Sequence, residues 1–511
     1  MTSNDSKRIA RNAVYLYGRM LLTVGASLYT TRLVMETLGV HNYGIYGLVG
    51  GIVAILGFIN GTMAGATQRF LNYEMGGGDP DRTRRTFSNA LLLHMAIAAL
   101  VVVLGETVGL WYVNSHLNIA PERMYAANVT YQLSILAAVA SIVQIPYVAS
   151  IMANERMNVY AGMSILNVGL KLGVAMSLVL FPGLDTLIIY AVMMAAAAWI
   201  VAALYRAYCV RKFSECRFSR HVDRGIFLSM LKFSGWDLYG NLCYTGRVQG
   251  TIVILNKFSG TALNAAGNLT LTVSGTITSF ASAVTTAFRP QIIQQYARRN
   301  YSDMLTLLNN CARYSFLLMG LLVAPMFIEM DYLLGLWLGF GDVPEYTATF
   351  CRISLIAACG ELLITTVCIG IHATGNVKRL SFISGTLYLI ELPAMYLLLK
   401  YTGRPPVVYC VHCLFIAMVL LADTIILKIQ LNSFRIRQFW RKGVLVPLLI
   451  VGAVTGSALW MKTLGEEGLM RAILMAMFTT AMTLSLTYCF GIDSATRNMV
   501  NNKIKRIIKR Q

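Results

Sequence analysis

The sequence predicts an all-α polytopic membrane protein with about fourteen transmembrane helices. The chain has 511 residues, of which 56% are hydrophobic and only 13% are charged, and its mean hydropathy is +0.60. This balance is typical of membrane proteins rather than soluble ones. In hydrocarbon the backbone must satisfy its own hydrogen bonds, which leaves helices or a closed barrel. The apolar runs are much longer than barrel strands and do not alternate, so they predict helices.

Fourteen apolar segments are long enough to cross a bilayer, which takes about 20 residues. Their approximate bounds are 11–35, 43–68, 87–113, 124–151, 158–181, 186–208, 230–256, 262–289, 307–330, 347–373, 379–400, 405–428, 443–463 and 469–490. Spans seven and eight carry many polar groups, and we expect a short turn rich in Gly and Asn between them.

The distribution of basic residues predicts the orientation. Lys and Arg are concentrated in alternate loops, on the side that includes both ends of the chain. Because cytoplasmic loops are enriched in Lys and Arg, we expect both termini in the cytoplasm. The N-terminal stretch is polar and the apolar run that follows is too long for a signal peptide, so no cleavage is expected.

A weak internal repeat predicts the domain organisation. A shift of 220 residues places 36–48 on 256–268, Arg69 on Arg289 and Asn89 on Asn309. Six spans separate the copies, which predicts two six-helix bundles related by a pseudo-two-fold axis along the membrane normal. The expected parts are an N-terminal bundle (1–208), a basic cytoplasmic loop (209–229), a C-terminal bundle (230–428), two additional helices (429–491) and a basic cytoplasmic tail (492–511).

Several classes of protein are excluded by the sequence. The net charge is +20, but the basic residues are dispersed among apolar spans, which argues against nucleic-acid binding. The ten cysteines lie mostly inside apolar runs and are typical of small buried hydrophobes, not of a disulfide framework. No phosphate-binding loop, nucleophile elbow or zinc motif is present, so we expect neither an enzyme nor a bound metal or cofactor.

Three cations lie deep inside predicted spans. They are Arg19 in span one, Lys171 in span five and Arg247 in span seven. A charge at this depth is costly unless it faces a cavity or a partner. We expect these three side chains to line an electropositive cavity. The alternative for Arg247 is an ion pair that holds helices together, for instance with Glu361.

Acidic residues also lie within the spans, and three of them are candidates for ion coupling. Asp237, Glu361 and Asp423 can take up H⁺ or Na⁺, and the alternative for each is a salt bridge or a hydrogen-bonded buried acid. Glu106 and Glu391 are the other acids at this depth. His94, His372 and His412 are interpreted as packed polar residues.

Three stretches of the chain resemble a known family. They are LVMETLGVHNYGIYGLVGGIVAILGFINGTMAGATQRF (33–70), the region from FSGWDLYGNL (233–242) to NYSDM (300–304), and HATGNVKRLSFISGTLYLIELPAMYLLLKYTGRPP (372–406). They resemble the Wzx-like polysaccharide or O-antigen flippases (lipopolysaccharide biosynthesis proteins) of the MOP exporter superfamily, which includes the MATE exporters and the lipid II flippase MurJ. The resemblance covers essentially the whole chain.

The resemblance implies a multi-pass flippase of the bacterial inner membrane. Such a protein would move an undecaprenyl-pyrophosphate-linked oligosaccharide from the cytoplasmic to the periplasmic leaflet by alternating access. Its partners would be this lipid-linked oligosaccharide, membrane lipids and, as candidates, polysaccharide polymerase and glycosyltransferases. The competing hypotheses are a MATE-type ion-coupled drug or cation antiporter and a membrane-embedded polymerase or ligase. The former predicts an acidic cavity, and the latter predicts a large periplasmic loop.

Overall fold

The computed structural model describes residues 3–116, 119–181, 185–218, 223–338, 343–462, 467–492, 497 and 501. Within these ranges the secondary structure is helical and contains no strand, which confirms the predicted all-α class. The helices are α1 (Ser3–Gly77), α2 (Pro80–Leu104), α3 (Leu110–His116), α4 (Met124–Val143), α5 (Ile145–Ala153), α6 (Met157–Ser177), α7 (Thr186–Lys212), α8 (Arg224–Ala297), α9 (Tyr301–Ile328), α10 (Met330–Leu338), α11 (Thr347–Thr374), α12 (Lys378–Thr402), α13 (Val407–Gln430), α14 (Ile436–Phe439), α15 (Val446–Lys462) and α16 (Leu469–Leu486).

Ten helical segments in these ranges are long and apolar enough to cross a membrane. Each coincides with one of the predicted spans three to six or nine to fourteen. The remaining four predicted spans lie in α1 and α8, which contain two each. The protein is therefore a multi-pass membrane protein by the length and composition of its helices.

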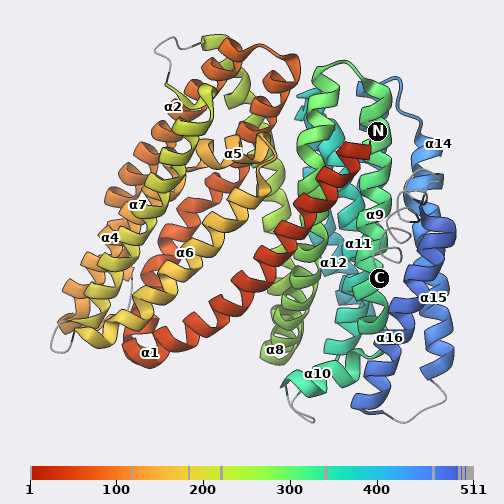
Figure 1. Cartoon of the computed structure of the whole chain (residues 1–511). Coiled ribbons are helices and arrows are strands. Elements are labelled where there is room, and N and C mark those ends of the chain that lie inside the picture. The colour runs from red at the N-terminus through yellow and green to blue at the C-terminus, as the bar shows by residue number, and fades with distance from the viewer. Residues whose placement is uncertain are drawn as a thin grey trace, which may run out of the picture. The chain divides into compact units, whose positions relative to one another are not determined.

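The expected turn between spans seven and eight is not a break in the helix. Helix α8 is assigned as continuous from Arg224 to Ala297, and α1 is likewise continuous through the corresponding region. Figure 1 shows that α1 changes direction at its lower end without leaving the helical trace.

The chain divides into two compact units, one formed by residues 10–238 and the other by residues 239–511 together with 1–9. In the first, which we call the N unit, α4 packs against α7 and α2, and α6 packs against α7. Its core contains Tyr131, Phe87 and Tyr205, all of them buried. The N unit includes the basic loop after α7, where Arg84 of α2 donates to the carbonyl of Arg217 at 2.9 Å.

In the second, the C unit, α13 packs against α11 and α12, and α9 packs against α11. Helices α15 and α16 pack against α9, so the two additional helices are part of this unit. At the α9–α15 contact, a Cβ on Gly320 would lie 2.4 Å from Cγ2 of Val451. A glycine is therefore required there for the two helices to approach closely. Most of the predicted tail, 492–511, lies outside the residues that the structure describes.

Two loops are fixed by acidic side chains at helix starts. Asp79 accepts hydrogen bonds from the backbone N–H groups of Asp81 and Arg82 at the start of α2. Asp185 does the same for Leu187 and Ile188 at the start of α7. Such caps satisfy N–H groups that have no partner inside the helix. Asp185 also pairs with Arg123 through two hydrogen bonds of 2.7 and 3.1 Å, which links α7 to the start of α4.

Candidate functional site

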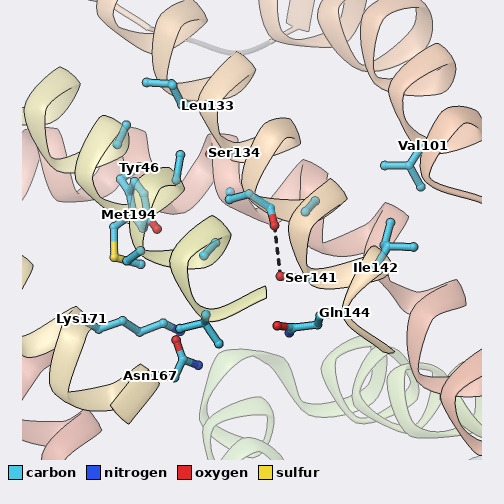
Figure 2. Close-up of a pocket in the computed structure, with 18 residues that line it drawn as sticks. Tyr46, Val101, Leu133, Ser134, Ser141, Ile142, Gln144, Asn167, Lys171 and Met194 are labelled. Atoms are coloured by element: carbon cyan, nitrogen blue, oxygen red, sulfur yellow. Dashed lines mark hydrogen bonds between the residues drawn. The ribbon is translucent and has the colours of Figure 1, made fainter. Parts of the chain in front are cut away.

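A cavity of about 340 Å³ lies inside the N unit and contains one of the three predicted cations. Lys171 of α6 lines it together with Asn167, which lies one turn earlier on the same face of the helix. Figure 2 shows these two side chains on the same side of the cavity as Gln144. Ser134 and Ser141 of α4 and small alanines of α7 form much of the remaining wall. The cavity is therefore polar at its base, with an ammonium group available to an anion.

Arg19 of α1 is half-buried and contacts an aromatic side chain of the same unit. Its Nη1 donates to the hydroxyl of Tyr160 at 3.2 Å, and its Cζ lies 4.8 Å from the centre of that ring. Neither Arg19 nor Lys171 forms a salt bridge with an acid in the part of the chain that the structure describes. The positive charges of both side chains are therefore not neutralised by a described neighbour.

Arg247 of α8 has a different environment in the C unit. Its Nη2 lies 3.0 Å from Oε1 of Glu361, which is the ion pair that the sequence analysis gave as the alternative. The guanidinium also lies over the ring of Tyr244, 4.8 Å from its centre. Arg247 is 6% exposed. Its charge is thus balanced inside the protein.

Two buried residues join this ion pair and form what we call the C-unit cluster (Arg247, Glu361, Glu391 and His412). Nδ1 of His412, on α13, lies 2.8 Å from Oε1 of Glu391, on α12. Its Nε2 lies 3.1 Å from Nη1 of Arg247. Glu391 is fully buried, and its second carboxylate oxygen has no hydrogen-bond partner among the residues that the structure describes.

A cavity of about 300 Å³ lies against the C-unit cluster. Arg247, Glu361 and His412 contribute to its wall, so Arg247 both lines a cavity and forms an ion pair. The rest of the lining combines hydroxyl groups with aromatic and apolar side chains: Tyr244, Val248, Thr251, Ile252, Leu271, Ser274, Gly275, Thr278, Ser354, Ala357, Ala358, Met395 and Tyr409.

The two predicted coupling acids of the C unit, Glu361 and Asp423, have different partners. Asp423 of α13 is fully buried, and it accepts a hydrogen bond from Ser384 Oγ at 2.6 Å and a weaker one from Cys368 Sγ at 3.8 Å. Glu361 belongs to the C-unit cluster. Asp237 is half-buried on α8 within the N unit.

Sequence position alone does not mark Glu391 and His412 as members of a site. From the sequence, Glu391 is only an acid within a predicted span, and His412 is predicted as a packed polar residue. Three polar side chains of α11 each meet a polar group on another helix. Glu361 pairs with Arg247, Cys368 contacts Asp423, and His372 lies 3.3 Å from a guanidinium nitrogen of Arg289.

No group of three or more His, Cys, Asp or Glu side chains with the arrangement of a metal site occurs among the described residues. Arg247 contacts both His412 and Glu361, and its positive charge would repel a metal cation at this position. The chemistry available to this arrangement is proton binding and the recognition of polar ligands.

Comparisons with known proteins identify the fold. The MatE family model matches residues 239–397, which lie within the C unit. A multidrug resistance MATE family transporter of the MOP superfamily in the outward-facing conformation has a TM-score of 0.72 and 12% identity, over 84% of this chain and 96% of its own. The Vibrio cholerae MATE transporter VcmN in the bent form has a TM-score of 0.68 and 15% identity, over 84% and 100%.

A third similar structure is a MOP superfamily transporter from Pyrococcus furiosus, described as having a binding pocket of reverse polarity that suggests a different function. Its TM-score is 0.68 and its identity 12%, over 84% of this chain and 96% of its own. No curated protein matches the sequence. This chain therefore has the fold of the MATE and MOP superfamily transporters, which are not enzymes.

Proposed function

We propose that this protein is an alternating-access transporter that moves an undecaprenyl-pyrophosphate-linked oligosaccharide from the cytoplasmic to the periplasmic leaflet of the bacterial inner membrane. The fold supports transport, because it is shared with MATE and MOP superfamily transporters over most of the chain. The choice of substrate is supported by the charges in the N unit.

The proposal rests on the surroundings of Lys171 and Arg19. Lys171 faces a polar cavity without a described acid, and Arg19 is held by a phenol rather than a carboxylate. A low-dielectric wall strengthens the attraction of such cations for an anion. Pyrophosphate and acidic sugars are anions of this kind, and guanidinium groups bind phosphate oxygens well. A cationic drug would be repelled by the same side chains.

A MATE-type ion-coupled drug or cation antiporter is the alternative function. It is favoured by the MatE match over 239–397 and by the buried acid Asp423. The Pyrococcus furiosus protein supports the view that this fold accommodates binding pockets of different polarity. The described acids of the C-unit cluster are balanced in part by Arg247, which reduces their attraction for a drug cation.

The remaining parts of the proposal follow from the lipid-linked substrate. Both termini lie in the cytoplasm, where the glycan is assembled on its lipid. Membrane lipids surround the protein, and glycosyltransferases and a polysaccharide polymerase, as in O-antigen and lipopolysaccharide synthesis, are its candidate partners. Coupling to H⁺ or Na⁺ through Glu361, Asp423 or Asp237 would supply the energy.

The experiment is deletion of the gene in its native host, followed by measurement of surface polysaccharide and of the leaflet in which the lipid-linked glycan accumulates. We expect loss of surface glycan, with the lipid-linked unit inaccessible to a lectin added to spheroplasts. Wild type should restore both, and Lys171→Ala should not, although it is expressed normally. Lys400→Ala, which changes an exposed lysine at the end of α12, is the matched control. An intact surface glycan together with new sensitivity to cationic drugs would establish the antiporter instead.

A further inference from the structure

We propose that His412 is the group that binds the coupling proton, with Glu391 as its positioning carboxylate and Arg247 and Glu361 as the partners that respond to the proton. This inference rests on the proposed transport function, because coupling has meaning only for a transporter. It places the proton on a residue pair that is distinct from Asp237, Glu361 and Asp423.

The contacts of the His412 ring involve both of its nitrogens. Nδ1 lies 2.8 Å from Oε1 of Glu391, and because a carboxylate only accepts, Nδ1 carries a hydrogen and donates it. Nη1 of Arg247, which can only donate, lies 3.1 Å from Nε2 and 3.5 Å from Nδ1. Nε2 also lies 3.5 Å from Oε1 of Glu361. Nε2 therefore faces both a donor and an acceptor, and it is the nitrogen that can release or bind a proton.

The charges of the C-unit cluster do not balance when His412 is neutral. Arg247 contributes one positive charge and the two carboxylates contribute two negative charges, while the neutral imidazole contributes none. One negative charge is left over in a set of side chains that includes the fully buried Glu391. Unbalanced buried charge is unfavourable. One added proton makes the cluster neutral, so the site is expected to bind one proton.

Binding of that proton must change the contacts of the cluster. The added proton binds to the lone pair of Nε2 and makes that nitrogen a donor, and Arg247 cannot donate to a donor. The nearest acceptor for Nε2 is Oε1 of Glu361, at 3.5 Å. In the structure this oxygen lies 3.0 Å from Nη2 of Arg247. Nε2 is expected to turn toward Glu361 as the contact with Nη1 breaks.

The groups that face His412 come from three other helices. They are Arg247 from α8, Glu361 from α11 and Glu391 from α12. The phenols of Tyr244 and Tyr388 lie against Arg247, with ring centres 4.8 and 5.7 Å from its Cζ. Proton binding therefore alters the interactions among four helices that surround one cavity, which is a route from protonation to a change of conformation.

The test is a direct titration of the full-length protein in detergent, without glycan, by NMR of ring-labelled histidine. The chain has six histidines, and the signal of His412 is assigned with His412→Gln. We expect wild-type His412 to show the Nδ1–H tautomer at high pH and to take up one proton between about pH 5 and pH 9. Loss of a carboxylate partner weakens the protonated ring, so Glu391→Gln should lower its proton affinity by about tenfold or more. The titration should be the same in sodium chloride and in choline chloride.

His94→Gln is the matched control, since His94 is also fully buried but its ring contacts the carbonyl of Ala90 instead of a carboxylate. It should leave the His412 titration unchanged. The proposal is overturned if wild-type His412 shows the Nε2–H tautomer, does not titrate in this range, or titrates identically in Glu391→Gln. It is also overturned if sodium displaces the proton, which would make the site a cation site. Since no substrate is used, these outcomes are independent of whether the glycan is transported.

Discussion

Replacement of Arg247 by methionine is expected to destabilise the C unit strongly, because it leaves buried carboxylates without their cation. Arg247 and Glu361 lie 3.0 Å apart with exposed side-chain fractions of 7% and 20%. At that distance and an effective dielectric constant of about 20, Coulomb's law gives an attraction of roughly 5 kcal/mol before desolvation. Breaking a buried pair by removing one partner costs about 3–5 kcal/mol. The single variant Arg247→Met should lose an amount in this range.

The double variant Arg247→Met/Glu361→Gln separates charge imbalance from loss of packing. Removing both partners leaves no unpaired carboxylate at Glu361, and such replacements are often close to neutral. We therefore expect the double variant to be more stable than Arg247→Met alone by about 2 kcal/mol or more.

The assay is thermal unfolding of the purified protein in detergent, with Lys400→Met as a control for loss of an exposed cation. A change of 1 kcal/mol moves the midpoint by roughly 2–4 °C in a domain of 150–250 residues, so a loss of about 3–5 kcal/mol in Arg247→Met should lower it by roughly 6–20 °C. Equal midpoints for wild type and Arg247→Met, or a double variant no better than the single one, would refute the reasoning. Arg247 would then be free to act mainly on the substrate.

Three further changes have expected outcomes. Lys171→Gln should reduce glycan transport about tenfold, because the loss of one charged contact costs about 1.4 kcal/mol. Its unfolding midpoint should not change, and Lys171→Arg should retain most of the transport activity. A large loss of stability in Lys171→Gln would show that Lys171 is structural. Gly320→Ala should cost about 1–3 kcal/mol through overpacking, because the added Cβ would meet Val451 at 2.4 Å, and Val451→Ala should recover part of the loss in thermal unfolding. Burial alone would raise the pKa of Asp185, but the hydrogen bonds and charge of Arg123 lower it below the usual value. Asp185 therefore stabilises the fold above the pKa of an unfolded aspartate, about 3.9, and this stabilisation is lost as the pH falls through the lower folded value; the midpoint difference between wild type and Asp185→Asn should accordingly be present at neutral pH and disappear in strong acid.

The length and polarity of the apolar segments determined the helical class and the positions of the membrane-length helices. These properties are local: a run of about 20 apolar residues must form its own backbone hydrogen bonds in lipid, whatever its neighbours are. The depth of Arg19, Lys171 and Arg247 was likewise visible from their places within the segments. The continuity of α8 was not, because Gly and Asn between two apolar segments predict a turn, whereas the structure keeps the helix through that segment.

Only the tertiary structure decided which charges are paired. Arg247 and Glu361 are 114 residues apart, and Arg247 and His412 are 165 apart, so their contacts depend on how α8, α11 and α13 pack. The same three cations appeared equivalent by type and depth in the sequence. Packing places Arg247 beside the carboxylate of Glu361 and leaves Lys171 beside amides and hydroxyls. Residue type and depth fix the cost of burying a charge, but the partner that offsets this cost is supplied by another helix.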